Sequence, residues 1–195
     1  MSDKRISRIG TPGVIPASDG SMTVSLQIEI RRLQRKLGKT FILVTHDQDE
    51  AMTVSDRVMV MNRGRIEQAG TPTEVYEHPV SRFVAQFLGA ANLIPAEASA
   101  DGLVTPFGMM QARETPQWQQ GTLAIRPERI RIHHEQPQRN FIHTGIRDVI
   151  YRGDHFEVFV NTGGLRVKTT PAERLRPGQQ VWLELPPEHL EVLCD

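Results

Sequence analysis

The sequence predicts an α/β region followed by a small all-β barrel, and three observations support this division. Apolar residues recur at helical spacing within residues 22–37. The apolar run Phe41–Val44 ends at Thr45-His46-Asp47 and is followed by an acidic, helix-favouring segment, as expected of a buried parallel strand that leads into a helix. From Asn92 onward, short strand-like segments alternate with glycine-containing turns, which is typical of a small barrel.

Composition restricts the class of protein. A chain of 195 residues can hold one large or two small domains, and 38% hydrophobic and 24% charged residues favour a globular fold. Lys+Arg and Asp+Glu number 23 each, and this balance disfavours a nucleic-acid binder. The single cysteine, Cys194, cannot form an internal disulfide, which suits a reducing compartment. No apolar run approaches the roughly 20 residues of a membrane span, and Met1–Gly20 lacks the apolar core of a signal peptide, so we expect a soluble cytoplasmic protein.

The expected elements of the first region follow in order. Residues 1–20 show no sustained periodicity and are expected to be an irregular lead-in. Thr71-Pro72-Thr73-Glu74 predicts a helix start, because Thr71 can cap, Pro72 suits the first helical position and Glu74 completes a capping box. The other expected elements are a helix over Met22–Leu37 stopped by Gly38, a strand over Thr40–Thr45, a helix near Gln48–Ser55, strands over Arg57–Met61 and Arg65–Gln68 around an Asn62-Arg63-Gly64 turn, and a helix over Val80–Leu88.

The second region is expected to contain short strands joined by hairpin turns. Arg152-Gly153-Asp154 and Thr162-Gly163-Gly164 lie between strand candidates, as hairpin turns do. Leu190 and Val192 alternate with Glu191, so the last candidate is expected to close the barrel. The strand candidates are Leu123–Ile125, Arg129–Ile132, Ile146–Tyr151, His155–Asn161, Leu165–Thr169, Val181–Leu185 and Leu190–Leu193.

Gly38-Lys39-Thr40 has the ending of a phosphate-binding P-loop, but its context excludes that motif. The first glycine of the pattern would fall at Leu33, and the segment follows a helix and precedes a strand, the reverse of the required order. We therefore expect Gly38 to end the helix and Lys39 to be a solvated turn residue.

Four segments follow one another in unbroken order: Leu33–Leu43, Val44–Ala51, Ser55–Val58 and Met61–Pro72. Together they resemble the carboxyl-terminal part of an ATP-binding-cassette (ABC) importer ATPase. The subgroup is the one with a carboxyl-terminal regulatory extension, which serves sugars, polyamines, ferric iron and phosphonates. The resemblance covers roughly Ala17–Asp195.

The β-rich region resembles the extension of the same subgroup, a small OB-like barrel called TOBE. Leu123-Ala124-Ile125-Arg126-Pro127-Glu128 matches its signature and Ala90–Pro95 matches its usual entry. The resemblance implies a fragment of a RecA-like P-loop ATPase core followed by a TOBE barrel. The expected boundaries are 1–20 for a non-homologous lead-in, 21–89 for the ATPase part and 90–195 for the barrel. Among the members of this subgroup, the barrel most resembles that of the ferric-iron, polyamine and phosphonate importers.

The resemblance also assigns roles. The parent function is ATP hydrolysis coupled to solute import, with ATP and Mg²⁺ as cofactors. His46 matches the switch histidine that contacts the γ-phosphate of ATP, and Asp19 falls where the D-loop aspartate lies at the interface with a second ATPase subunit. Transmembrane permease subunits are the implied partners, which would place the assembled protein at the inner face of the cell membrane.

The departures from the family predict that this sequence is catalytically inactive. It has no Walker A loop, Q-loop or LSGGQ signature before the first helix, and the Walker B acidic pair would fall at Pro12 and Gly13. Those residues cannot coordinate magnesium or polarise water. We therefore expect an amino-terminally truncated subunit that binds no ATP tightly, and no metal-binding residues are assigned.

Two other functions stay open from the residues. One is a non-catalytic TOBE module for regulation or oxyanion binding. A set of arginines could make such contacts, although exposed arginines are common and a solvated β surface is the favoured interpretation. The other is an OB-fold nucleic-acid binder, disfavoured by zero net charge and few aromatics. The arginines concerned are Arg126, Arg129, Arg131 and Arg152.

Overall fold

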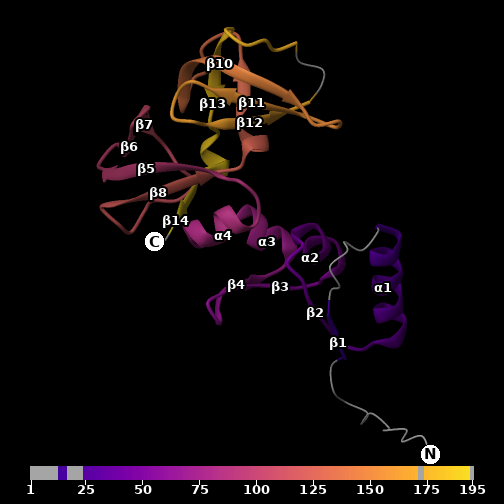
Figure 1. Cartoon of the computed structure of the whole chain (residues 1–195). Coiled ribbons are helices and arrows are strands. Elements are labelled where there is room, and N and C mark those ends of the chain that lie inside the picture. Colours follow the sequence, from indigo (N-terminus) through magenta and orange to yellow (C-terminus); the bar gives the residue numbers. More distant parts are fainter. Residues whose placement is uncertain (1–12, 17–23, 171–173, 194–195) are drawn as a thin grey trace, which may run out of the picture. The chain divides into compact units, whose positions relative to one another are not determined.

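The computed structural model describes residues 13–16, 24–170 and 174–193, and it divides into two compact units that are treated separately below (Figure 1). The first unit comprises residues 1–59 and 69–75, and the second comprises residues 60–68 and 76–195. Among the helices that these described ranges contain, none is long and apolar enough to cross a membrane.

The first unit contains a two-stranded parallel sheet. Strand β1 (Gly13–Pro16) pairs with β2 (Phe41–Val44) in the register Gly13↔Phe41 to Pro16↔Val44. The sequence analysis expected irregular chain throughout residues 1–20, so β1 corrects that expectation. A four-residue strand that contains glycine and proline has no visible period, and its pairing with β2 defines it.

Helix α1 (Val24–Leu37) carries apolar residues that the described chain does not cover. Val24, Leu33 and Leu37 are 67, 49 and 52% exposed. The helix ends as predicted, because Gly38 takes φ +59° and its N–H donates to the Gln34 carbonyl at 2.9 Å. Lys39 is exposed, and its segment runs from helix to strand, which agrees with the exclusion of a P-loop.

Two local turn predictions are confirmed. The strands β3 (Val58–Asn62) and β4 (Arg65–Gly70) form a two-stranded sheet, and the turn residues Arg63 and Gly64 both have positive φ, 47° and 79°. Before α3 (Pro72–Glu77), the Thr71 N–H donates to Glu74 Oε2 at 2.8 Å and the Glu74 N–H donates to Thr71 Oγ1 at 3.3 Å. This reciprocal pair is a capping box.

The second unit contains two five-stranded sheets, with orders β12-β11-β10-β13-β9 and β14-β8-β5-β6-β7. The pairs with a resolved register in these sheets are antiparallel. Their strands are β5 (Asn92–Ser99), β6 (Gly102–Thr105), β7 (Gly108–Met110), β8 (Gln120–Ile125), β9 (Arg131–His133), β10 (Phe141–Tyr151), β11 (Phe156–Val160), β12 (Arg166–Thr169), β13 (Gln180–Glu184) and β14 (Glu191–Leu193).

One apolar core joins the two sheets. Ile94 and Leu123 from one sheet and Val158 and Val181 from the other are all fully buried in the same cluster. Strand β10 pairs with two strands, because residues 141–145 pair with β13 and residues 146–151 pair with β11, and the β10–β11 pairing has a register shift between Ile146 and Asp148. The all-β region is therefore a self-contained structure with its own core.

The last strand does not have the position expected from the sequence. Strand β14 lies at the edge of its sheet, where it pairs with β8, rather than between two strands as a closing strand would (Figure 1). Leu190 and Leu193 are fully buried, whereas Val192 is partly exposed. Leu190 and Val192 contact the same core, as the alternation predicted, whereas Leu193 packs in a separate cluster with Ala85 and Ala124.

Candidate functional site: a polar network around the Ile125-Arg126-Pro127-Glu128 turn

His46 lies in the strand-to-helix turn predicted for it. It is exposed in the bend between β2 and α2 (Gln48–Val54). The flanking residues fix this turn, since Asp47 Oδ1 accepts the Glu50 N–H at 3.0 Å as an N-cap and the Thr45 hydroxyl donates to Glu50 Oε2 at 2.7 Å. The turn therefore leaves the imidazole of His46 in solvent at the end of β2.

The residues around His46 do not form a nucleotide site by themselves. The other assigned residue, Asp19, lies outside the described residues. The Asp47 carboxylate is used as a helix cap, and no cluster of three or more potential metal ligands occurs in the part of the chain that the structure describes. The described residues thus supply one exposed imidazole but no phosphate cradle or magnesium ligands for ATP.

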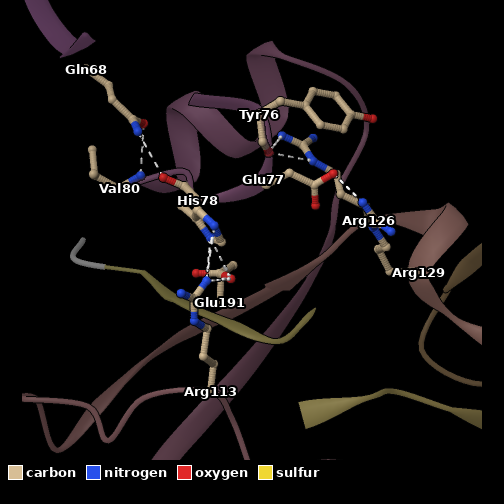
Figure 2. A network of polar contacts seen from close by, with 9 residues as sticks. All are labelled: Gln68, Tyr76, Glu77, His78, Val80, Arg113, Arg126, Arg129 and Glu191. Atoms are coloured by element: carbon tan, nitrogen blue, oxygen red, sulfur yellow. Dashed lines mark hydrogen bonds and ion pairs between the residues drawn. The ribbon is translucent and has the colours of Figure 1, made fainter. Parts of the chain in front are cut away.

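The arginine of the signature turn is buried, which corrects the favoured interpretation of a solvated side chain. Only 5% of Arg126 is exposed. Its guanidinium donates to the Tyr76 carbonyl from Nε at 3.2 Å and from Nη2 at 2.8 Å (Figure 2). Its Nη1 donates at 2.8 Å to the carbonyls of both Ala85 and Gly89. The guanidinium also lies over the Tyr76 ring, 4.1 Å from the centroid. Desolvation by burial lowers its pKa from the ordinary value.

Two further pairs attach the same turn to helix α3. The Tyr76 hydroxyl donates to Glu128 Oε1 at 2.6 Å, and Arg129 forms an ion pair with Glu77 (Figure 2 shows the latter). The pKa of Tyr76 is raised to about 12, mainly because the phenol is removed from water and secondly because it is hydrogen-bonded to Glu128. The hydrogen bond with Glu77 raises the pKa of Arg129.

A second group of contacts lies on the other side of the 76–80 segment. The Glu191 carboxylate of β14 lies 3.0 Å from His78 Nδ1 and 3.7 Å from Arg113 Nη1 (Figure 2). The Gln68 amide donates to the His78 carbonyl at 2.9 Å and accepts the Val80 N–H at 3.1 Å. The segment is therefore held between Gln68 and the edge strand β14.

Together, these contacts have a structural role, which is to attach one segment of the chain to the β-rich region. Residues 76–89 are attached to the β-rich region by the buried Arg126, the Arg129–Glu77 ion pair, the contact between His78 and Glu191, and the Ala85–Ala124–Leu193 cluster. Sequence analysis missed Tyr76 and Glu77 because they lie about fifty positions from their partners. The signal that could have found them was the signature arginine, since an arginine beside the buried strand β8 requires acceptors.

The remaining arginines of the set are exposed and paired. Arg131 lies 3.7 Å from Glu184, and Arg152 donates to Glu157 from Nε at 3.0 Å and Nη2 at 2.9 Å. Exposed pairs of this kind contribute roughly 0–1 kcal/mol to folding stability. The favoured interpretation of a solvated surface fits these two and fails for Arg126.

Comparison with known proteins confirms the resemblance to ABC importer ATP-binding subunits. Residues 123–193 match the TOBE domain family. The spermidine/putrescine import ATP-binding protein PotA of Thermobifida fusca is 39% identical over 194 residues, covering 91% of this chain and 50% of the relative. The Fe(3+) ions import ATP-binding protein FbpC of Escherichia coli K12 is 41% identical over 184 residues, covering 91% and 51%. The sulfate/thiosulfate import ATP-binding protein CysA 2 of Chromobacterium violaceum is 39% identical over 188 residues, covering 90% and 51%.

The chain spans about half the length of the curated relatives it matches. Among solved structures, the cytoplasmic molybdate-binding protein ModG with molybdate bound superposes with a TM-score of 0.45 at 12% identity, covering 52% of this chain and 94% of that one.

Proposed function

We propose that this chain is the carboxyl-terminal part of an ABC importer ATP-binding subunit, including its regulatory extension. The chain is homologous to such subunits and carries a TOBE domain in residues 123–193. The observation that carries this proposal is the 39–41% identity to three import ATP-binding proteins over about nine-tenths of the chain. The parent activity is ATP hydrolysis coupled to solute import, with permease subunits and a second ATPase subunit as partners and a location at the inner face of the membrane. The relatives' names include polyamine, ferric-iron and sulfate importers, and we propose a solute of the ferric-iron, polyamine or phosphonate type.

Within this proposal His46 has the role of a γ-phosphate sensor in an assembled nucleotide site. Its exposure at the end of β2 supports this role, because an imidazole that a bound phosphate must reach cannot be buried in its own domain. Asp19 is proposed to lie at the interface with the second ATPase subunit.

The polypeptide of residues 1–195 alone is proposed to be catalytically inactive. Its sequence has no glycine-rich phosphate cradle in the required context and no Walker B acidic pair. Calorimetry with Mg²⁺ and ATP, together with a phosphate-release assay, tests this point. Magnesium-dependent binding in the low micromolar range, or turnover above background, would overturn it.

The import role is tested by exchanging sequence with a relative. Residues 24–193 replace the matching region of FbpC of Escherichia coli K12, and ATP hydrolysis and Fe(3+) transport are measured with its permease. We expect transport to persist and to be lost in the same chimera with His46→Ala, because the phosphate sensor is removed. His143→Ala, which changes an exposed histidine on β10, is the matched control and should leave transport unchanged. A folded, assembled chimera without ATPase activity would contradict the role.

A second function, a non-catalytic TOBE-type regulatory module, is favoured by one observation. The two sheets of the second unit share one buried core that needs no residue from the first unit. Such a module would act through binding or contact with a partner. Regulation is then expected to survive in a fragment that lacks residues 1–59.

A further inference from the structure

A groove on the second unit lies beside the buried Arg126 network, and the proposed import role assigns no function to this groove. Its volume is about 280 Å³, which is close to the lower end of the roughly 300–1,000 Å³ of pockets that hold small organic ligands. It is lined by Tyr76, Gly89 and the Pro127-Glu128 turn and by strand β12, whose Arg166 and Lys168 form its cationic wall. All of its lining residues belong to the second unit.

The cations of the groove retain free donors, whereas its carboxylates are already bonded. Glu128 accepts the Tyr76 hydroxyl at 2.6 Å, and Glu157 accepts two hydrogen bonds from Arg152. Arg166 uses Nη2 for the Ala90 carbonyl at 2.9 Å, and its other guanidinium nitrogens have no recorded bond within the described residues. Lys168 is exposed, lies opposite Glu157 in the β11–β12 register, and has no recorded hydrogen bond or ion pair to a described residue.

The position of the cationic wall is fixed before any ligand arrives. The Asn92 side chain, 7% exposed, accepts the Arg166 N–H at Oδ1 and donates from Nδ2 to the Arg166 carbonyl, both at 2.8 Å. Arg166 and Lys168 are two residues apart on one strand, so their side chains leave the same face and line the same groove. A ligand that binds them therefore has little conformational entropy of the backbone to remove.

The net charge of the groove favours an anion. Arg126, Arg166 and Lys168 oppose the two carboxylates Glu128 and Glu157, which leaves an excess of one positive charge. Asp154 is bonded to His155, with Nδ1 at 2.6 Å from Oδ1, and also interacts electrostatically with Lys168, but its charge is offset by Arg152, which is bonded to Glu157. The buried Arg126 bonds only carbonyl oxygens, so its positive charge contributes to the potential of the groove without a directly bonded carboxylate.

We propose that this groove binds a small organic dianion, a phosphate monoester or a dicarboxylate, with its charged end on Arg166 and Lys168. Guanidinium and ammonium donors suit phosphate and carboxylate oxygens, and the guanidinium fork can bind two oxygens of one group. The volume leaves space for a short carbon skeleton, and the Tyr76–Glu128 wall supplies polar atoms for its hydroxyl groups. The site is independent of ATP and of the import role.

The test is isothermal calorimetry on the full 195-residue chain with four probes: ribose 5-phosphate, succinate, inorganic phosphate and neutral ribose. Saturable binding of ribose 5-phosphate or succinate, stronger than that of inorganic phosphate and weakened by added salt, is expected. Which of the two binds more tightly distinguishes a phosphate from a dicarboxylate ligand. Absence of saturable binding for both organic dianions, or equal binding of neutral ribose, would overturn the proposal.

Substitutions assign the binding to the groove. Lys168→Gln and Arg166→Gln are each expected to weaken binding about tenfold or more, the usual effect of losing a charge-assisted hydrogen bond. Lys168 is exposed and Arg166→Gln keeps its backbone bonds to Asn92, so both variants should retain the wild-type thermal melt. Arg139→Gln removes an exposed arginine outside the groove and should not change affinity. Unchanged affinity in both groove variants would disprove the assignment, whereas failure of the import role would appear only in the FbpC chimera.

Discussion

Arg126 and Tyr76 contact each other in two ways at once: the guanidinium donates to the Tyr76 carbonyl from Nε and Nη2, and it lies 4.1 Å from the centroid of the tyrosine ring. The pair joins helix α3 to the start of the η1 turn (Pro127–Arg129), fifty positions later in the chain. The hydrogen bonds of the buried cation thus hold the 76–89 segment against the β-rich region through backbone carbonyls, and the Tyr76 ring adds a side-chain contact to these hydrogen bonds.

Replacing the buried guanidinium should be costly. Arg126→Met leaves the carbonyls of Tyr76 and Ala85 without their donor, whereas the Gly89 carbonyl still accepts the Ala91 N–H at 2.7 Å. Unsatisfied buried acceptors destabilise by about 1–3 kcal/mol each, so we expect a loss of at least roughly 2 kcal/mol. Urea denaturation of the full chain measures it. Arg139→Met, at an exposed site, should change stability by less than about 0.5 kcal/mol. Equal effects of the two variants would show that the carbonyls are satisfied in another way.

The same contacts place the start of the autonomous unit before residue 90. The sequence analysis placed the start of the barrel at residue 90. Because such a fragment lacks all three carbonyl acceptors of Arg126, we now expect a fragment of residues 60–195 to melt cooperatively and that of residues 90–195 to melt at a clearly lower temperature. Circular dichroism of both fragments tests this, and equal melting temperatures would restore the shorter boundary.

Deprotonation of Tyr76 is expected to lower the folding stability of the second unit at alkaline pH. Its pKa is raised from 10.0 to about 12, so the folded state favours the protonated phenol, and the resulting stability is complete below pH 10 and is lost as pH rises toward 12. Tyr76→Phe removes this linkage and should flatten the decline in stability between pH 10 and 12. The difference in ultraviolet absorbance between wild type and variant reports the titration of Tyr76 directly. A difference titration centred at pH 10 would contradict the raised pKa.

Local chemistry could be predicted from the sequence, and long-range contacts could not. The capping box of Thr71 and Glu74 and the positive φ of Gly38 each depend on residues within four positions, and both were predicted correctly. Strand β5 was missed, because Pro95 and an alanine- and glutamate-containing segment lack the β-branched pattern of a typical strand. Its place is fixed by pairing with β8, almost thirty residues later.

In the candidate site, too, local features could be predicted from the sequence and long-range contacts could not. Sequence reasoning placed His46 in an exposed strand-to-helix turn, because the turn is encoded by neighbouring residues. It treated Arg126 as a solvated arginine, since an arginine at the end of a strand is usually exposed. Only the fold brings Tyr76, Ala85 and Gly89 to it, from 50, 41 and 37 positions away.

The first unit is expected to self-associate. The exposed apolar side chains of α1 are accompanied by Ile42 and Val44 of β2, which are 39 and 63% exposed, and such surface is an association site. Sedimentation velocity of the full chain should reveal oligomers at micromolar concentration, and limited proteolysis should cut residues 24–59 before the β-rich region. The double variant Leu33→Glu, Leu37→Glu should shift the distribution toward monomer. A monodisperse wild-type monomer with uniform protease resistance would refute this expectation.

Removal of the edge strand β14 should unfold the β-rich region, because this strand contributes side chains to its core. Deleting residues 190–195 removes the fully buried Leu190 and Leu193, each worth about 2–5 kcal/mol by comparison with large-to-small core substitutions, and leaves the Trp118 indole N–H without the Leu193 carbonyl that accepts it at 2.9 Å. It also removes Glu191, the acid that His78 and Arg113 share. Thermal melting of the shortened chain should therefore show no cooperative transition. A chain ending at Leu193 is the matched control and should melt as the full chain does. A cooperative melt that persists without residues 190–195 would show that β8 is stable as the edge of its sheet.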